Sequence, residues 1–143
     1  MARTHLLDTS VYSQLIRPAI PATVTARWQA VGDDAMVTSA ICEAEVLYGI
    51  RKKGATRLLR DYEFVLKGRY DLLDIDAHVA STYADLRVAC EAAGFTVGDM
   101  DLLIAATAKT HNLTVATLNY SDFSHIPGVA VEDWSLPPAP PSS

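Results

Sequence analysis

The sequence predicts an α/β fold of three layers, in which helices cover both faces of a central, mainly parallel sheet. Short apolar segments alternate with longer helical patterns along the chain, and strands separated by helices usually pair in parallel. The chain has 143 residues, half of them hydrophobic and a fifth charged, which suits one domain with a single core. Residues 102–108 are almost all apolar or small, as expected of a helix buried in that core.

The first half of the chain is predicted to contain two strands and four helices. The strands cover residues 4–8 and 35–38, and the helices cover residues 11–16, 21–31, 40–53 and 56–67. Thr9 and Ser10 are suited to capping the first helix, and Pro18 ends it. Ser39 is suited to capping the third helix, which ends at Gly54.

The second half is predicted to continue this alternation. Strands are expected at residues 71–75, 113–118 and 129–131, and helices at residues 77–93 and 101–110. Asp76 and Asp99 are suited to capping these two helices, and Gly94 closes the first of them. Residues 119–123 have the pattern of a turn or a single helical turn.

The domain organisation follows from composition. We assign residues 1–134 to a single domain and residues 135–143 to a flexible tail, because that tail is rich in proline and is not expected to pack. The N-terminus lacks a signal-peptide pattern, and no apolar run approaches the ~20 residues that span a bilayer. A cytoplasmic protein without a membrane anchor is therefore expected. Cys42 and Cys90 lie far apart in helical patterns and are expected to be buried, without a disulfide or a zinc site.

Four acidic residues on separate elements are the candidates for a functional site. They are Asp8 at the end of the first strand, Glu45 in the third helix, Asp101 at the start of the buried helix, and Asp122 after the strand at residues 113–118. Each of them alone has an ordinary structural role, as a turn residue, a helix cap or half of an ion pair. A parallel sheet, however, brings the carboxyl ends of its strands to one edge, where ligands bind. We therefore expect these acids to meet there.

The chemistry of these acids predicts a metal site. Carboxylates held close together repel one another unless a cation intervenes, and no Lys or Arg is placed in the same motifs. Oxygen ligands without His or Cys select hard ions, so the residues indicate Mg²⁺ or Mn²⁺, which suits phosphoryl chemistry. Glu45 is favoured over Glu43 as a member, because it shares a helical stripe with Ile41 and Tyr48 that should face inward.

Signals for other chemistry or for a substrate are weaker. The sequence has no P-loop, no dinucleotide-binding glycine motif and no Gly-x-Ser-x-Gly elbow, and its 4 histidines are scattered. Thr9, Ser10 and Thr117 could hold metal waters or substrate phosphates, although capping explains them equally well. The net charge of −5 argues weakly against nucleic acid, but one short stretch is basic. Its members are Arg51, Lys52, Lys53, Arg57 and Arg60.

The motifs around the acids follow one another in a specific order. They are LDTS at residues 7–10, TS at 38–39, AEVLYG at 44–49, DLLIAATA at 101–108, TLNYSDF at 117–123, IPGV at 126–129 and VEDW at 131–134. Together they resemble, over residues 6–134, the PIN-domain ribonucleases, and specifically the VapC-type toxins of bacterial toxin–antitoxin pairs.

The resemblance implies a small α/β/α fold and a metal-dependent endoribonuclease. Asp8, Glu45 and Asp101 match the family's three central acids, and Asp8 and Asp101 are implied to hold the tighter metal. The fourth position is either Asn119, whose counterpart is often acidic in relatives, or Asp122 within the same motif. The family further implies an RNA substrate, a homodimer, and inhibition by a cognate VapB-type antitoxin, often through an arginine that enters the acidic site.

We therefore expect in-line hydrolysis of an RNA phosphodiester, with Arg51, Lys52 and Arg87 as candidate contacts to the RNA backbone. Two alternatives stay open at this point. The acidic pocket could capture a basic partner peptide without turnover, or the chain could be another metal-dependent phosphoesterase, such as a DNase.

Overall fold

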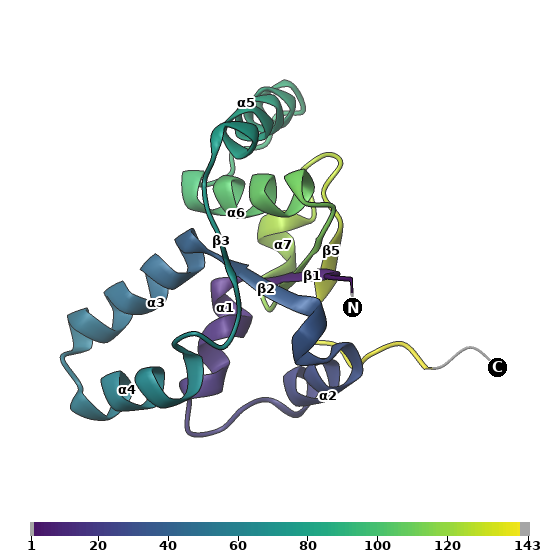
Figure 1. Cartoon of the computed structure of the whole chain (residues 1–143). Helices are drawn as coiled ribbons and strands as arrows, with labels where there is room; N and C mark the ends of the chain where they lie inside the picture. The colour runs from purple at the N-terminus through teal and green to yellow at the C-terminus, as the bar shows by residue number, and fades with distance from the viewer. Residues whose placement is uncertain (1, 141–143) are drawn as a thin grey trace.

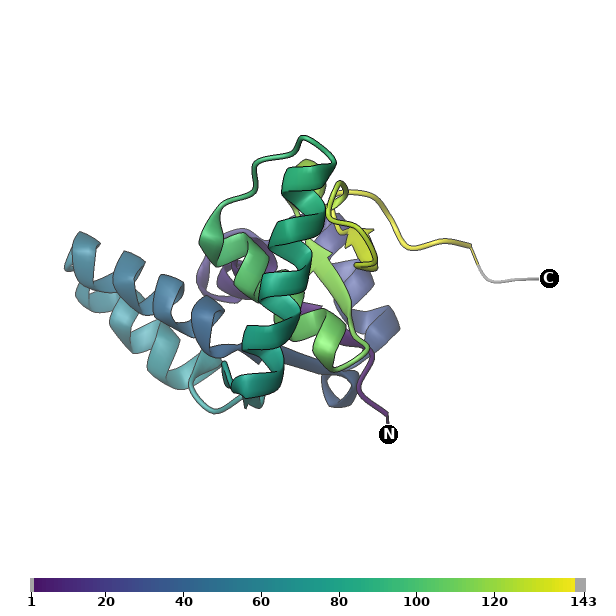
Figure 2. The same ribbon diagram turned by 90° about the horizontal axis from the view of Figure 1, so that it is seen from above.

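The centre of the molecule is a five-stranded sheet in the order β3-β2-β1-β4-β5, in which every neighbouring pair is parallel. The structure is a computed structural model that describes residues 2–140. The strands are β1 (His5–Leu7), β2 (Met36–Ser39), β3 (Leu72–Leu73), β4 (Thr114–Thr117) and β5 (Val131–Asp133). Helices lie on both faces of the sheet (Figures 1 and 2), which confirms the predicted three-layer α/β/α fold.

Seven α-helices and three shorter turns connect these strands in the part of the chain that the structure describes. The helices are α1 (Thr9–Tyr12), α2 (Ala22–Val31), α3 (Ala40–Lys53), α4 (Thr56–Asp61), α5 (Ala77–Ala92), α6 (Asp99–Thr110) and α7 (Tyr120–Phe123). Two 3₁₀ turns cover Ser13–Ile16 and Asp33–Ala35, and a π-helical turn covers Tyr62–Leu66. Both views show α3 and α4 running side by side away from the sheet (Figures 1 and 2).

Two of the predicted helix caps are confirmed. The Ser39 hydroxyl accepts a hydrogen bond from the backbone N–H of Cys42 at 3.1 Å, which starts α3 immediately after β2. The Asp76 carboxylate accepts one from the backbone N–H of Val79 at 2.9 Å, which starts α5. Both elements begin where the sequence predicts, because a side-chain cap is a local device.

Two other cap predictions were wrong. The first helix begins at Thr9, directly after β1, because the backbone carbonyl of Asp8 already accepts from Val11 and Tyr12. Thr9 and the residue after it therefore lie inside the helix and do not cap it. The buried helix begins at Asp99, with Gly98 in the cap position.

Three element boundaries also differ from the prediction. The helix expected at residues 56–67 changes after residue 61 into the π-helical turn, and the strand expected at 71–75 has only two residues. The last strand begins two residues later than expected, because Gly128, with φ of 75°, lies in a turn in which Val129 donates to the carbonyl of Ile126. Pairing with β4 then places Val131 beside Val115.

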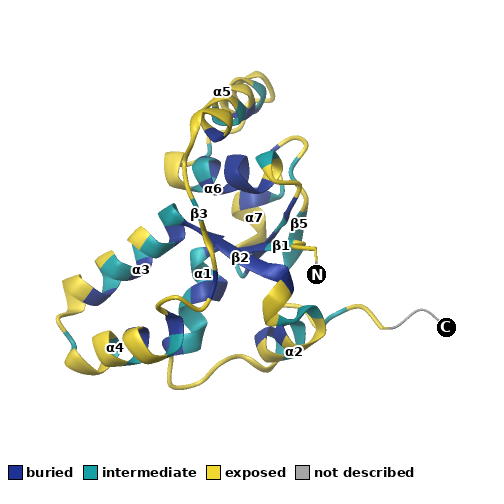
Figure 3. Ribbon diagram, in the orientation of Figure 1, coloured by how far each residue is buried: buried dark blue, intermediate teal, exposed yellow. Residues whose placement is uncertain are grey.

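The core surrounds the sheet and the inner face of α6. Leu102 and residues 104–108 are buried, so the prediction of a buried helix is confirmed. The central strands β1, β2 and β4 are mostly buried, with β2 dark blue in Figure 3, whereas the edge strands β3 and β5 are more exposed. Cys42 and Cys90 are buried free thiols, as expected. The first residues of the predicted tail contact α2, since Arg27 donates to the carbonyls of Leu136 at 3.0 Å and Pro137 at 2.9 Å. Positions 141–143 of the tail lie outside the described residues. No helix of the described chain is long and apolar enough to cross a membrane.

Candidate active site

Asp8 lies at the carboxyl end of the central strand and is only 4% exposed. Two hydroxyls hold one of its oxygens, because Ser10 donates to Oδ2 at 2.8 Å and Thr117, at the end of β4, donates to it at 2.9 Å. These hydroxyls are themselves fixed, since they accept the backbone N–H groups of Leu118 and Asn119, each at 2.9 Å. Among residues 2–140 no group donates a hydrogen bond to Oδ1, so this oxygen is available to an external partner.

Glu45 reaches the same region from α3. The Thr9 hydroxyl donates to its Oε1 at 2.6 Å, which ties the helix to the end of the first strand. Glu43 lies on a different face, where the Tyr12 hydroxyl is 3.4 Å from each of its oxygens. The structure therefore separates the two acids as predicted, but the stripe argument was partly wrong, because Tyr48 is 65% exposed.

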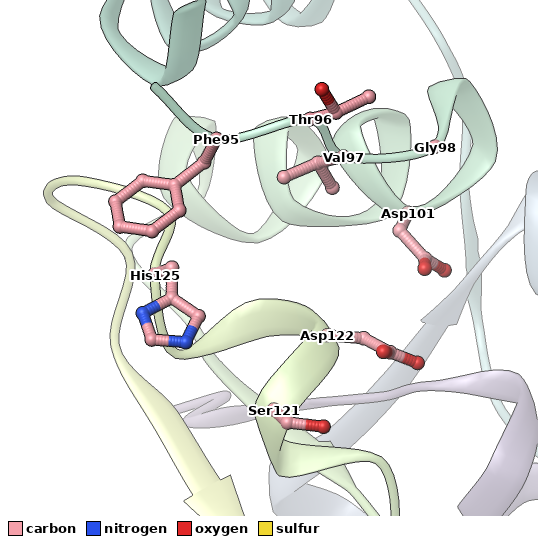
Figure 4. A pocket seen from close by; sticks show the side chains of 8 residues that line it. All are labelled: Phe95, Thr96, Val97, Gly98, Asp101, Ser121, Asp122 and His125. Atoms are coloured by element: carbon pink, nitrogen blue, oxygen red, sulfur yellow. The ribbon is translucent and has the colours of Figure 1, made fainter. Parts of the chain in front are cut away.

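Asp101 and Asp122 come from two other elements. Asp101 lies in the first turn of α6, and Asp122 lies in α7, which follows β4. Figure 4 shows their carboxylates directed into the same space. They line a pocket of about 150 Å³ together with Phe95, Thr96, Val97, Gly98, Ser121 and His125.

The electrostatics of Asp101 show that the four acids form one group. Burial raises its pKa, and repulsion from Asp8, Asp122 and Glu45 raises it further, to about 6. No lysine or arginine of the described chain forms an ion pair with any of the four. The fold thus concentrates negative charge at the carboxyl edge of its sheet without an ion pair from residues 2–140, although Arg17 and Lys53 line a neighbouring pocket with Glu45.

The donor set fits a hard divalent ion in a partly hydrated state. No three Asp, Glu, His or Cys side chains within residues 2–140 are already grouped to bind one ion. Mg²⁺, however, usually keeps several waters and is bound through one or two carboxylates. Asp8 Oδ1 and the Asp101 carboxylate supply such oxygens, and a cation there would relieve the repulsion that raises the pKa of Asp101.

Comparison with known proteins identifies the family. The PIN domain family model matches residues 5–129 of the chain. The chain belongs to the PIN domain family. A tRNA(fMet)-specific endonuclease VapC from Shigella flexneri is 30% identical over 133 residues, which cover 91% of this chain and 97% of that protein.

Solved structures agree with this assignment. The crystal structure of FitAcB from Neisseria gonorrhoeae superimposes with a TM-score of 0.84 at 31% identity, covering 92% of this chain and 99% of that chain. The crystal structure of DNA-bound VapBC from Salmonella typhimurium has a TM-score of 0.79 at 29% identity, covering 92% of this chain and 98% of that chain. The family resemblance seen in the motifs is therefore confirmed.

Other predicted site residues of this PIN domain lie in different surroundings. Thr9 and Ser10 are engaged by the acids, so they orient carboxylates in this state of the protein. Asn119 is exposed, and its backbone N–H rather than its side chain joins the network around Asp8. Asp122, by contrast, lines the pocket beside Asp101.

None of the three basic candidates forms an ion pair with the four acids. Arg51 and Lys52 are exposed in the last turn of α3. Arg87, on α5, lies 3.2 Å from a Glu91 oxygen and 3.4 Å from an Asp99 oxygen, so two acids already neutralise it.

The aromatic end of the pocket was not predictable from the sequence motifs. Phe95 and His125 line it, but neither belongs to a motif with catalytic spacing. Phe95 follows the Gly94 helix stop and precedes the segment that leads to Asp101. A single aromatic side chain among the otherwise small residues of this connection was the one signal available.

Proposed function

We propose that this PIN domain is a metal-dependent endoribonuclease that hydrolyses RNA phosphodiester bonds. The observation that carries the proposal is the group of Asp8, Glu45, Asp101 and Asp122, in which burial and then repulsion from the other three acids raise the pKa of Asp101 to about 6. RNA as the substrate is supported by the name of the Shigella flexneri relative, a tRNA(fMet)-specific endonuclease.

In this proposal each acid has a separate role. Asp8, through Oδ1, and Asp101 bind Mg²⁺ or Mn²⁺, and Asp122 completes the site in preference to Asn119 because it shares the pocket with Asp101. When bound, the ion supplies an acidic water and neutralises charge on the phosphate oxygens.

Glu45 is the candidate that binds the ion or orients the attacking water. Its Oε1 is held by the Thr9 hydroxyl at 2.6 Å, which leaves Oε2 to accept the proton of that water as its oxygen attacks phosphorus. The bond from phosphorus to the leaving oxygen breaks on the opposite side, and that oxygen takes a proton from solvent water to leave as a hydroxyl group. Ser10 and Thr117 act on Asp8 by fixing the direction of its carboxylate.

We further propose that the chain is the toxin of a type II toxin–antitoxin pair, acts in the cytoplasm as a homodimer and is inhibited by a VapB-type antitoxin. The solved VapBC complex from Salmonella typhimurium supports such a partner. An arginine or lysine of the antitoxin would find four carboxylates that no cation of the described chain pairs with.

The test is cleavage of total RNA with added Mg²⁺, with and without EDTA, by the wild type and by Asp8→Asn. The wild type should cleave only with metal, and Asp8→Asn should fold but not cleave. Equal cleavage by both proteins, or no cleavage by either at any metal concentration, would reject the mechanism.

Two further measurements address the alternatives. A DNA oligonucleotide of matched sequence separates a ribonuclease from a DNase. Binding of a basic antitoxin peptide without any metal-dependent cleavage would instead identify a pocket that captures a partner without turnover.

A further inference from the structure

Two aromatic rings stack at one end of the pocket, and the proposed chemistry does not use that end. The rings of Phe95 and His125 have centroids 4.8 Å apart and planes inclined by 17°. Phe95, in the connection between α5 and α6, is 40% exposed, and His125, after α7, is exposed as well. An isolated exposed apolar side chain is common. A stacked and exposed pair of rings that lines a pocket, however, is suited to binding a ligand with a flat face.

The position of the pair relative to the acids limits what that ligand is. Figure 4 shows the two rings at one end of the pocket and the carboxylates of Asp101 and Asp122 at the other. A molecule that spans the pocket therefore presents a flat apolar face to the rings and a group that binds cations to the acids. The pocket measures about 150 Å³, below the ~300–1,000 Å³ of sites for drug-sized ligands, so it accommodates one ring system.

We propose that Phe95 and His125 form a stacking platform for the nucleobase next to the scissile phosphate. This inference rests on the proposed ribonuclease function and adds to it a subsite that binds and positions the substrate. A nucleotide joins a flat base to a phosphate, which matches the two ends of the pocket. Bases that leave a helical stack are commonly bound on aromatic side chains, and such stacking tolerates any base because every base has a π-face.

The binding of this base is tested with a short single-stranded RNA that the wild type cleaves. Phe95→Leu keeps apolar bulk but removes the π-face, so KM should rise by about 5-fold to about 150-fold with a smaller change in kcat. Phe95→Tyr should restore KM because it restores the ring. Phe64→Leu is the matched control, since Phe64 is 84% exposed and is not among the residues that line the pocket.

A modified RNA separates stacking from a structural role of the pair. An abasic nucleotide beside the cleaved bond should raise KM for the wild type as much as Phe95→Leu does with intact RNA. The two changes together should add little, because both remove the same contact. Additive effects, or a Phe95→Leu protein that loses activity only in proportion to lost folding in a thermal unfolding scan, would overturn the platform.

Binding in EDTA, followed by fluorescence anisotropy of labelled RNA, distinguishes failure of this inference from failure of the proposed function. Cleavage by the wild type with unchanged KM in Phe95→Leu rejects the platform and leaves the ribonuclease. If the wild type binds RNA without cleaving it, and binding weakens in Phe95→Leu and recovers in Phe95→Tyr, the ribonuclease is rejected and the platform is supported. If the wild type neither cleaves nor binds RNA, both proposals are rejected. Both are also rejected if Phe95→Leu weakens only the binding of a basic peptide.

Discussion

Two carboxylates of this molecule, Asp101 and Glu132, are both partly buried, but their pKa values shift in opposite directions. Burial alone would raise the pKa of Glu132, yet the Trp134 indole N–H at 2.9 Å, the His5 ring at 3.2 Å and the Arg27 guanidinium at 3.1 Å lower it below its ordinary value. Burial and three neighbouring carboxylates raise the pKa of Asp101 to about 6.

The difference separates an acid that the fold neutralises from one that it leaves exposed to repulsion. The charge of Glu132 is compensated by partners within the chain, and these contacts connect β5 to β1 and α2. The charged form of Asp101 is destabilised by burial and by its neighbours, and either a proton or a cation supplied from outside the described chain relieves this. A buried acid without a neutralising partner, such as Asp101, is a candidate for a functional role. A buried acid that its neighbours neutralise, such as Glu132, is a candidate for a structural role.

The largest expected effect comes from removing the charge of each of these two acids in turn. Asp101→Asn should lower the rate of RNA cleavage at least about 100-fold, because loss of a direct ligand should exceed the ~10- to 100-fold effect of outer partners. Glu132→Gln should keep the rate within about 2-fold and should unfold at a lower temperature. Cleavage rates and thermal unfolding of both variants measure this, and the comparison fails if Glu132→Gln is the inactive one.

The fold was predictable wherever one local device decides the structure. Ser39 and Asp76 cap their helices through their own side chains, so the starts of α3 and α5 were read correctly. The start of α1 depends on how the chain leaves the sheet at Asp8, and the start of β5 depends on its pairing with β4. Hydrophobic periodicity carries no information on either, nor on the π-helical turn after α4.

The site was predictable to the extent that topology decides it. Parallel strands bring Asp8 and the residues after β4 to one edge, so the meeting of the acids could be expected from element order. The Thr117 hydroxyl that orients Asp8 comes from 109 positions along the chain, and only the folded structure shows it as a donor to that carboxylate. The neutralisation of Glu132 by Arg27 was likewise hidden, because Arg27 lies outside all of the motifs around the four acids and far from Glu132 along the chain.

The second expected effect concerns the stability that Arg27 provides by neutralising Glu132. Arg27→Met keeps the apolar stem but removes the charge opposite Glu132 and the donors to the Asp133, Leu136 and Pro137 carbonyls. The free energy of unfolding should fall by about 2–3 kcal/mol, and the Tm by roughly 5–10 °C. Denaturant and thermal unfolding measure the two quantities.

The control for that change is an arginine whose partners are exposed. Arg87 has a side chain that is 51% exposed and pairs with Glu91 and Asp99, whose side chains are more exposed still. Arg87→Met should therefore lower the free energy of unfolding much less than Arg27→Met does. Equal losses for both variants would mean that Glu132 is no better neutralised than a surface acid.

The smallest expected effect is the pH dependence of stability that Asp101 causes. Its pKa is about 6 in the folded protein and 3.8 as an ordinary carboxyl group, so between these values the folded state holds a proton that the unfolded state has lost. Stability from this group is therefore complete below about pH 4 and is lost as the pH rises through about 6. Full conversion of the shift gives ~3 kcal/mol, which solvent screening at this half-open site reduces to about 1–2 kcal/mol.

Asp101→Asn provides the reference for this measurement, because asparagine does not titrate. In EDTA, the free energy of unfolding of the wild type should fall relative to that of Asp101→Asn from about pH 4 to about pH 6 and stay level above it. Saturating Mg²⁺ should restore the wild type near pH 7, by ~2.7 kcal/mol at 100 times Kd, and should have little effect near pH 4, where the carboxyl is protonated. If the two proteins instead keep a constant difference across this range, the carboxylates around Asp101 do not repel it. The contrast with Glu132 then disappears, and so does the physical reason for a cation at this edge of the sheet.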